Sequence, residues 1–129
     1  MSKHLVFVYG TLRRGGVRAM PDLFPEAKFI GQAKVRGNLY DLGTYPGLLL
    51  DESDSLVVGE VYEVDDETLG KLDEIEASSL YRRKQVEVSL AGRKVTCWVY
   101  VDNSRLYPGR TLIISGDWIE YAGTKGEIP

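Results

Sequence analysis

Turn-forming pairs and triplets interrupt this chain so often that only short elements fit between them. They include Gly15-Gly16, Arg36-Gly37, Tyr45-Pro46-Gly47, Ala91-Gly92 and Tyr107-Pro108-Gly109. The runs between them are rich in valine, isoleucine, leucine and tyrosine, which favour β-strands. We therefore predict a mostly β chain, with strands near 4–9, 28–41, 47–50, 56–64, 81–90, 93–102 and 111–114.

Two of these runs indicate how their strands are buried. The first, Leu5-Val6-Phe7-Val8-Tyr9, is apolar at every position, so we expect a central strand that is covered on both faces. In the second, residues 85–90 alternate between polar and apolar side chains, as a strand with one buried face does. Ala91-Gly92 then predicts a tight hairpin to the strand at 93–102.

Three segments are predicted to contain helix. Residues 65–76 carry leucine and isoleucine at helical spacing, and Asp65 or Asp66 can cap the start. A second short helix is expected after Ser115, and a turn of helix within 17–25, where prolines limit its length. Many short strands with few helices predict a small α+β domain whose sheet curls into a barrel or half-barrel.

Length, composition and charge limit the classes of function. The 129 residues predict one domain, 1–129, and the formal net charge of -3 argues against a nucleic-acid-binding protein, which carries a basic face. No stretch approaches the roughly 18 apolar residues that a membrane span needs, so we expect no membrane role. The N-terminal apolar run is too short for a signal peptide, and the single cysteine fits a cytoplasmic protein.

The residues of common catalytic and metal sites are scarce. His4 is the one histidine, and its place at the start of a strand favours a surface residue over a catalytic base. Cys97 is the one cysteine, so no internal disulfide can form, and its alternation with Val95 and Val99 favours a small core residue. A zinc site needs clustered cysteine and histidine, so we expect no metal.

The longest predicted helix carries one carboxylate on its apolar side. At about 100° per residue, Leu69, Leu72 and Ile75 form one face. Glu76 falls inside that face, whereas Glu74 falls on the opposite side. Burial and the negative end of the helix dipole should both raise the pKa of an inward Glu76 above about 4.3. An inward carboxyl of this kind is the best candidate for general acid–base work.

A second interpretation is open for the same carboxylate. The helix can end one residue earlier, because Ala77-Ser78-Ser79 frays easily, and Glu76 would then turn into solvent. In that case Glu76 is an ordinary surface glutamate without a raised pKa. The two interpretations differ in whether the carboxyl is shielded from water.

The first predicted strand runs into a turn rich in glycine and arginine, Tyr9-Gly10-Thr11-Leu12-Arg13-Arg14-Gly15-Gly16. This turn matches neither G-x-x-x-x-G-K-[ST] nor G-x-G-x-x-G, and no strong helix follows to supply an N-terminal dipole. A nucleotide-binding role is therefore not supported. We interpret Arg13 and Arg14 as solvated loop charges.

Several short motifs follow one another along the chain. They are Tyr9-Gly10-Thr11-Leu12-Arg13, Tyr45-Pro46-Gly47, Val58-Gly59-Glu60-Val61-Tyr62, Leu72-Asp73-x-x-Glu76, Tyr81-x-Arg83 and Ser115-Gly116-Asp117-Trp118. In this order they resemble the gamma-glutamylcyclotransferase-like family, and the resemblance covers about residues 5–120. Ala77 departs from the pattern, since many family members have glycine after the glutamate.

The resemblance implies a fold and a reaction. The fold would be a small mixed β-barrel of about six to seven strands, flanked by two or more short helices, with one cavity. The reaction would cyclise a gamma-glutamyl amine or amino acid to 5-oxoproline and release the free amine. Members of this short format are similar to the gamma-glutamylamine cyclotransferase type. The resemblance places the catalytic glutamate at Glu76 and the substrate-binding residues at Tyr9, Gly10, Thr11, Leu12 and Tyr81.

The implied chemistry suits a chain with so few reactive residues. The nucleophile is the substrate's own α-amine, and well-oriented intramolecular attack has an effective molarity of roughly 10⁵–10⁸ M. Such an enzyme needs neither cofactor nor metal. Its expected partner is a small gamma-glutamyl compound, and neither a nucleic acid nor a membrane is expected to bind. The sequence does not indicate an oligomeric state. One alternative is a non-catalytic module on the same fold that binds a small amino-acid-like ligand. A nucleic-acid-binding barrel is a more distant alternative.

Overall fold

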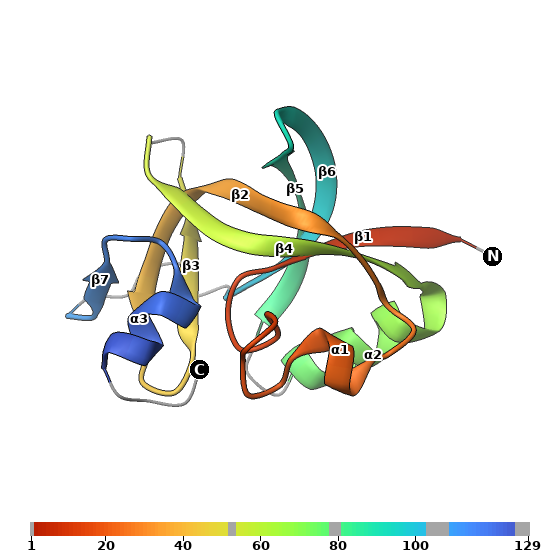
Figure 1. The fold of residues 1–129 in the computed structure, drawn as a ribbon, viewed down its shortest axis with the longest axis horizontal. Coiled ribbons are helices and arrows are strands. Elements are labelled where there is room, and N and C mark those ends of the chain that lie inside the picture. The colour runs from red at the N-terminus through yellow and green to blue at the C-terminus, as the bar shows by residue number, and fades with distance from the viewer. Residues whose placement is uncertain (1, 52–53, 78–80, 103–108, 126–129) are drawn as a thin grey trace.

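The computed structural model describes residues 2–51, 54–77, 81–102 and 109–125. The strands are β1 (Lys3–Val8), β2 (Lys28–Asp41), β3 (Pro46–Leu50), β4 (Leu56–Asp65), β5 (Tyr81–Leu90), β6 (Arg93–Asp102) and β7 (Thr111–Ile113). The helices are α1 (Met20–Leu23), α2 (Asp66–Ala77) and α3 (Trp118–Thr124). Every predicted strand is confirmed to within one residue at each end, and all three predicted helical segments contain helix (Figure 1). Within the described ranges, no helix has the length and apolarity that crossing a membrane requires.

Five of the strands close into a barrel. They follow the order β2-β4-β1-β6-β5, and β5 pairs back onto β2 where Ala33 faces Leu90 and Lys34 faces Ser89. β1 and β6 run parallel whereas the other barrel pairs are antiparallel, so the sheet is mixed. The predicted mixed barrel with flanking helices is confirmed. The whole sheet has seven strands, as predicted, but the closed barrel has five of them.

β2 belongs both to the barrel and to an extension beyond it. Up to Arg36 it pairs with β4, and from Gly37 onward it pairs with β3 and β7. α3 lies beside this extension, whereas α1 and α2 lie together at the other end of the molecule (Figure 1). The first residue of β3, Pro46, lies against Gly10 in the loop that follows β1. The extension therefore reaches the segment that carries the predicted site.

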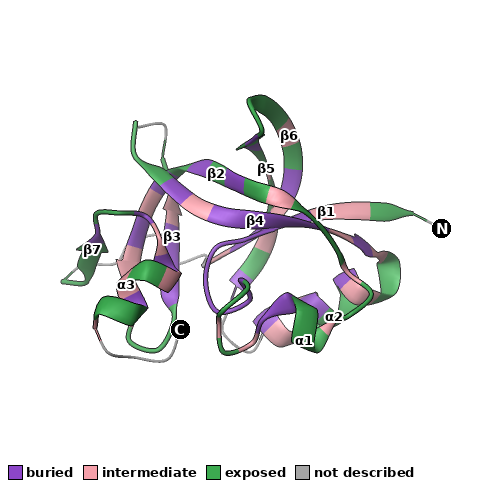
Figure 2. Cartoon of the chain, in the orientation of Figure 1, coloured by how far each residue is buried: buried purple, intermediate pink, exposed green. Residues whose placement is uncertain are grey.

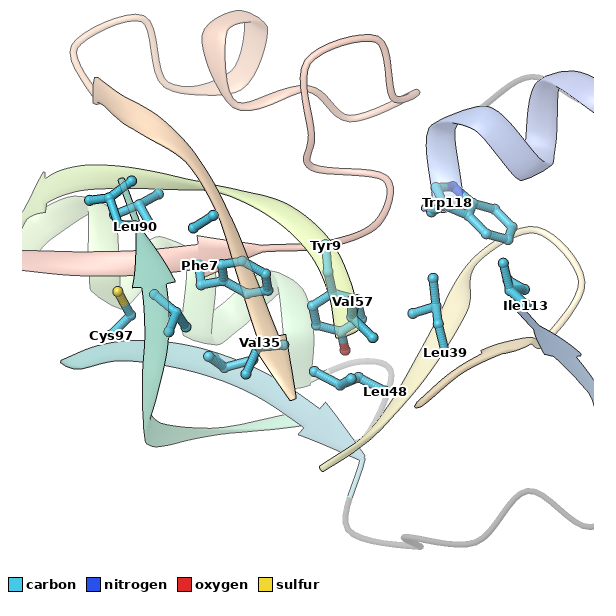
Figure 3. Close-up of a cluster of buried hydrophobic side chains, with 14 of the residues drawn as sticks. Phe7, Tyr9, Val35, Leu39, Leu48, Val57, Leu90, Cys97, Ile113 and Trp118 are labelled. Atoms are coloured by element: carbon cyan, nitrogen blue, oxygen red, sulfur yellow. The ribbon is translucent and has the colours of Figure 1, made fainter. Parts of the chain in front are cut away.

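β1 separates two apolar cores, as its uniformly apolar sequence predicted. Phe7 belongs to the larger core inside the barrel, whereas Val6 and Val8 belong to a smaller core with Met20 of α1 and Leu72 of α2. The larger core also contains Tyr9, Val35, Leu39, Leu48, Val57, Leu90, Cys97, Ile113 and Trp118 (Figure 3). Figure 2 shows the buried stretch of β4 lying between β2 and the pair of helices α1 and α2. Burying each large apolar side chain stabilises the fold by about 1.5–3 kcal/mol.

Local signals in the sequence determine the start of α2, the start of α3 and the turn between β5 and β6. The Thr68 N–H donates to Asp65 Oδ1 (2.8 Å), so Asp65 caps α2. Asp117 caps α3 in the same way. Ala91 and Gly92 both have positive φ angles, 51° and 79°, as a two-residue type I′ hairpin turn requires.

Candidate active site

The loop between β1 and α1 is packed tightly against itself and against β3. The Arg18 N–H donates to the Thr11 carbonyl (3.0 Å). Gly16 lies so close that a Cβ there would be 2.3 Å from the Thr11 carbonyl oxygen, and a Cβ on Gly10 would be 2.7 Å from Pro46 Cγ. Neither position leaves room for a side chain. The close approach that Gly10 permits is thus to the ring of Pro46.

Arg13 anchors this loop to the barrel and to α3, so the prediction that it is a solvated charge was wrong. It is 6% exposed, and its guanidinium donates to Glu60 (Nε to Oε2, 3.0 Å) and to Asp117 (Nη1 to Oδ1, 2.8 Å). Both carboxylates come from distant parts of the chain, which no local pattern shows. Arg14 is exposed, as predicted, with its guanidinium carbon 4.8 Å from the centre of the Phe29 ring.

A pocket lies beside this loop, between β1, the start of β3, the end of α2 and the neighbouring ends of β5 and β6. All six residues predicted for the site line it: Tyr9, Gly10, Thr11, Leu12, Glu76 and Tyr81. The remaining lining residues are Phe7, Val8, Arg18, Tyr45, Pro46 and Tyr100. The fold therefore brings together residues that the sequence places in three separate motifs.

Glu76 reaches this pocket from the last turn of α2. It is 5% exposed whereas Glu74 is exposed, so the inward orientation predicted from helical spacing is confirmed. The interpretation in which the helix ends before Glu76 is wrong, because α2 continues to Ala77. Burial raises the pKa of Glu76, and the positive charge of Arg18 partly offsets this rise. Among the described residues, none forms a hydrogen bond or ion pair with the Glu76 carboxyl.

Three of the lining residues have backbone N–H groups that find no acceptor among the described residues. The carbonyl groups of Gly10, Thr11 and Leu12 accept, in turn, from the N–H groups of Arg13, Arg18 and Met20. Within the described chain, the backbone N–H groups of Gly10, Thr11 and Leu12 donate to no protein acceptor. A loop whose carbonyls are paired and whose N–H groups are free suits an anion, such as a carboxylate or an oxyanion.

Three tyrosines line one side of the pocket, and hydrogen bonds from their hydroxyl groups hold the side chains in place. Tyr9 donates to the Tyr100 carbonyl (2.6 Å), and Tyr81 donates to the Pro46 carbonyl (2.7 Å). Tyr100 donates to Asp73 Oδ1 (2.8 Å). Burial and the Asp73 carboxylate raise the pKa of Tyr100, which keeps its hydroxyl protonated. Tyr81 in particular ties the start of β5 to the start of β3.

His4 and Cys97 lie outside the pocket. His4 is half-buried where a surface residue was predicted, because its Nε2 contacts the Asp66 carboxylate at the start of α2. Cys97 is 1% exposed in the barrel core, as predicted, and burial raises the pKa of its thiol to about 11. In the part of the chain that the structure describes, no group of three or more His, Cys, Asp or Glu residues is placed to hold a metal ion.

Comparison with known families gives independent information about the class of protein to which this chain belongs. The family model described as gamma-glutamyl cyclotransferase, AIG2-like, matches residues 6–120. The chain belongs to this family. The match spans both the loop after β1 and the end of α2, and it confirms at the family level the resemblance seen in the motifs.

Relatives of this gamma-glutamyl cyclotransferase family member share most of its length. A Vibrio cholerae protein, named provisionally as a gamma-glutamylcyclotransferase, is 41% identical over 123 residues, which cover 92% of this chain and 97% of that protein. The gamma-L-glutamyl-butirosin B gamma-glutamyl cyclotransferase of Niallia circulans is 37% identical over 125 residues, which cover 90% and 76%. The crystal structure of YkqA from Bacillus subtilis has a TM-score of 0.81 at 29% identity, covering 97% of this chain and 43% of that longer one.

Six residues that line the pocket of this family member were not predicted as site residues, and three of these have polar side chains: Arg18, Tyr45 and Tyr100. A signal existed for Tyr100, because the alternation in β6 that buries Cys97 in the barrel core directs Tyr100 to the opposite face, toward α2. Tyr45 is the first residue of the motif Tyr45-Pro46-Gly47, to which no site role was assigned. Arg18 gives no such signal, since it lies in a loop without periodicity.

Proposed function

We propose that this chain is a cofactor-free gamma-glutamyl cyclotransferase, which converts a gamma-glutamyl amine or amino acid to 5-oxoproline and the free amine. The observation that carries the proposal is the buried carboxyl group of Glu76 in a pocket that Gly10, Thr11 and Leu12 also line. The backbone N–H groups of these three residues have no protein acceptor among the described residues. A base beside anion-binding donors is what a proton transfer through a negatively charged intermediate requires.

In the proposed reaction, the α-amine of the substrate attacks its own γ-carbonyl carbon. The new C–N bond closes a five-membered ring, and the carbonyl oxygen becomes an oxyanion that the N–H groups of Gly10, Thr11 and Leu12 stabilise. Glu76 takes a proton from the attacking nitrogen and gives it to the leaving nitrogen, whose bond to the carbonyl carbon then breaks. Glu76 ends as the carboxylate it was at the start.

The raised pKa of Glu76 suits both proton transfers. A carboxylate with an ordinary pKa is a weak base near neutral pH, and burial makes it a stronger one. Proton transfer in both directions is most efficient when the pKa of the group lies near the working pH. The attack itself needs no protein nucleophile, because its effective molarity is roughly 10⁵–10⁸ M when the substrate is well oriented.

Two substrate classes fit this chemistry, since only the leaving nitrogen takes part in it. Gamma-glutamyl amines are the substrates that the gamma-glutamylamine cyclotransferase type would take, and gamma-glutamyl amino acids react in the same way. The Niallia circulans relative is named for this reaction on gamma-L-glutamyl-butirosin B, which supports the reaction class.

The test is incubation of the purified protein with a panel of gamma-glutamyl amines and gamma-glutamyl dipeptides, with 5-oxoproline measured by mass spectrometry. We expect 5-oxoproline and free amine in equal amounts from at least one member of the panel. No product from any member would contradict the proposal. If a panel member then raised the melting temperature without turnover, the non-catalytic binding module would be supported instead.

A further inference from the structure

Arg18 supplies the one positive charge among the residues that line the pocket. Its backbone is held by the loop, because the Arg18 N–H donates to the Thr11 carbonyl (3.0 Å). Its side chain is half-buried, and the pocket otherwise presents aromatic and aliphatic groups and the carboxyl of Glu76. A substrate that enters the pocket will therefore come close to the positive charge of Arg18.

Among the residues that the structure describes, the guanidinium of Arg18 has one weak partner. Its recorded hydrogen bond, from Nη2 to Thr11 Oγ1, is 3.5 Å long, at the outer limit for such a bond. Among the described residues, no carboxylate pairs with it, whereas Arg13 in the same loop pairs with two. A guanidinium has five N–H donors in a planar fork that matches a carboxylate. The planar fork of Arg18 is therefore available to a carboxylate of a bound substrate.

The charges of Arg18 and Glu76 influence each other across the pocket without an ion pair. Both residues line the same pocket, and the positive charge of Arg18 lowers the pKa of Glu76. A gamma-glutamyl compound carries an ammonium group and one or more carboxylates. Such a substrate can lie between the two side chains, with its amine toward Glu76 and a carboxylate toward Arg18.

The position of Arg18 at the rim indicates which carboxylate it meets. Phe7 and Val8 in the wall of the pocket are at most 3% exposed, whereas Tyr45 is 38% exposed and Arg18 is half-buried. The glutamyl part, which forms the ring, must lie beside the buried Glu76. The leaving group differs between substrates and must depart, so it belongs at the rim.

We propose that Arg18 binds a carboxylate of the leaving group, which makes gamma-glutamyl amino acids the preferred substrates over gamma-glutamyl amines. This inference rests on the proposed cyclotransferase function and narrows its substrate class. Arg18 acts here as a specificity-determining residue. The reacting atoms remain those already described. The contact between Arg18 and the leaving group affects only which leaving groups bind tightly.

The experiment uses two substrates that differ by one carboxylate, gamma-glutamylalanine and gamma-glutamylethylamine. We expect R18Q to lower kcat/KM for gamma-glutamylalanine about 10- to 100-fold, the loss that follows from removing a charged hydrogen-bonding partner. For gamma-glutamylethylamine the loss should stay below about 3-fold. Any effect of Arg18 on the pKa of Glu76 is common to both substrates, so it cancels in the ratio of the two losses.

Two further variants complete the comparison. R14Q removes an exposed charge from the same loop and should leave both substrates unaffected. R18K keeps the charge without the planar fork and should restore part of the preference. Equal losses with both substrates in R18Q would overturn the inference while the proposed function stood. No product from wild-type protein with any panel substrate would overturn both.

Discussion

Glu76 shows what local spacing can predict about a residue and what it cannot. Helical periodicity was enough to predict that its side chain points inward, because Leu69 and Leu72 determine which face of α2 is buried. The same periodicity could not show which groups it meets, since Arg18 comes from the β1–α1 loop and Tyr100 from β6. Burial raises the pKa of Glu76 and the positive charge of Arg18 partly offsets the rise, which distinguishes Glu76 from a surface glutamate.

Replacing Glu76 with glutamine should stabilise the protein at neutral pH. Burial raises the folded-state pKa above the unfolded value, so the stability linked to this group is fully present at low pH and is lost as the pH rises through the folded-state pKa. E76Q carries no ionising group there and avoids this loss. Its free energy of unfolding should exceed the wild-type value by about 1.4 kcal/mol for each unit by which the pKa is raised.

Denaturant unfolding at about pH 4 and about pH 8 measures this difference. The increase in the free energy of unfolding of E76Q over wild type should be small at the lower pH and should reach its full size at the higher pH. E74Q is the matched control, because Glu74 is exposed on the opposite side of α2. A gain in E76Q of the same size at both pH values would contradict the assignment of a raised pKa.

At the scale of elements, the loop after β1 was predicted as a motif but not as a structure. The glycines and the family motif indicated where a substrate would be held. They did not indicate that Arg13 is buried, because its partners Glu60 and Asp117 lie 47 and 104 residues further along the chain. The pairing connects three elements, since Glu60 lies in β4 and Asp117 caps α3. The shape of the loop thus depends on the assembled fold.

Replacing Arg13 with alanine should be far more damaging than replacing its neighbour Arg14. R13A leaves Glu60, which is 6% exposed, as a buried carboxylate without its cation. Breaking a buried ion pair in this way costs about 3–5 kcal/mol. R14A removes an exposed side chain and should change the free energy of unfolding by no more than about 0.5 kcal/mol. Urea unfolding of the two variants provides the measurement, and similar losses in both would refute the anchoring role of Arg13.

At the scale of the whole molecule, the positions of the strands could be predicted from local sequence. Which of them close into a barrel could not be predicted in this way, because closure depends on contacts between distant strands. Alternation and turn residues located each strand, because these features act over a few residues. The closure of the barrel depends on two residue pairs between β2 and β5, Ala33 with Leu90 and Lys34 with Ser89. The pattern of short strands predicted a barrel or half-barrel and the family resemblance a barrel, but neither separated the five barrel strands from the two that extend β2.

The extension should belong to the same cooperative unit as the barrel. Ile113 of β7 is 3% exposed within the larger core, whereas the adjacent Leu112 is 43% exposed. I113A should therefore cost about 2–5 kcal/mol, and L112A should cost much less. Both variants should unfold in one transition when followed by fluorescence and by circular dichroism. Loss of β7 in a separate early transition would show that the extension is not part of the barrel's unit.

The most direct test of the central claim is the rate of 5-oxoproline formation by wild type, E76Q and E74Q, with the best substrate of the panel. Glutamine fills the same space as glutamate but cannot accept and return the proton. We predict that E76Q remains folded and loses turnover by about 10²–10⁴-fold, the usual contribution of a general acid–base residue. E74Q should retain the wild-type rate. Equal rates in E76Q and E74Q would contradict the role of Glu76 as the proton-transferring group.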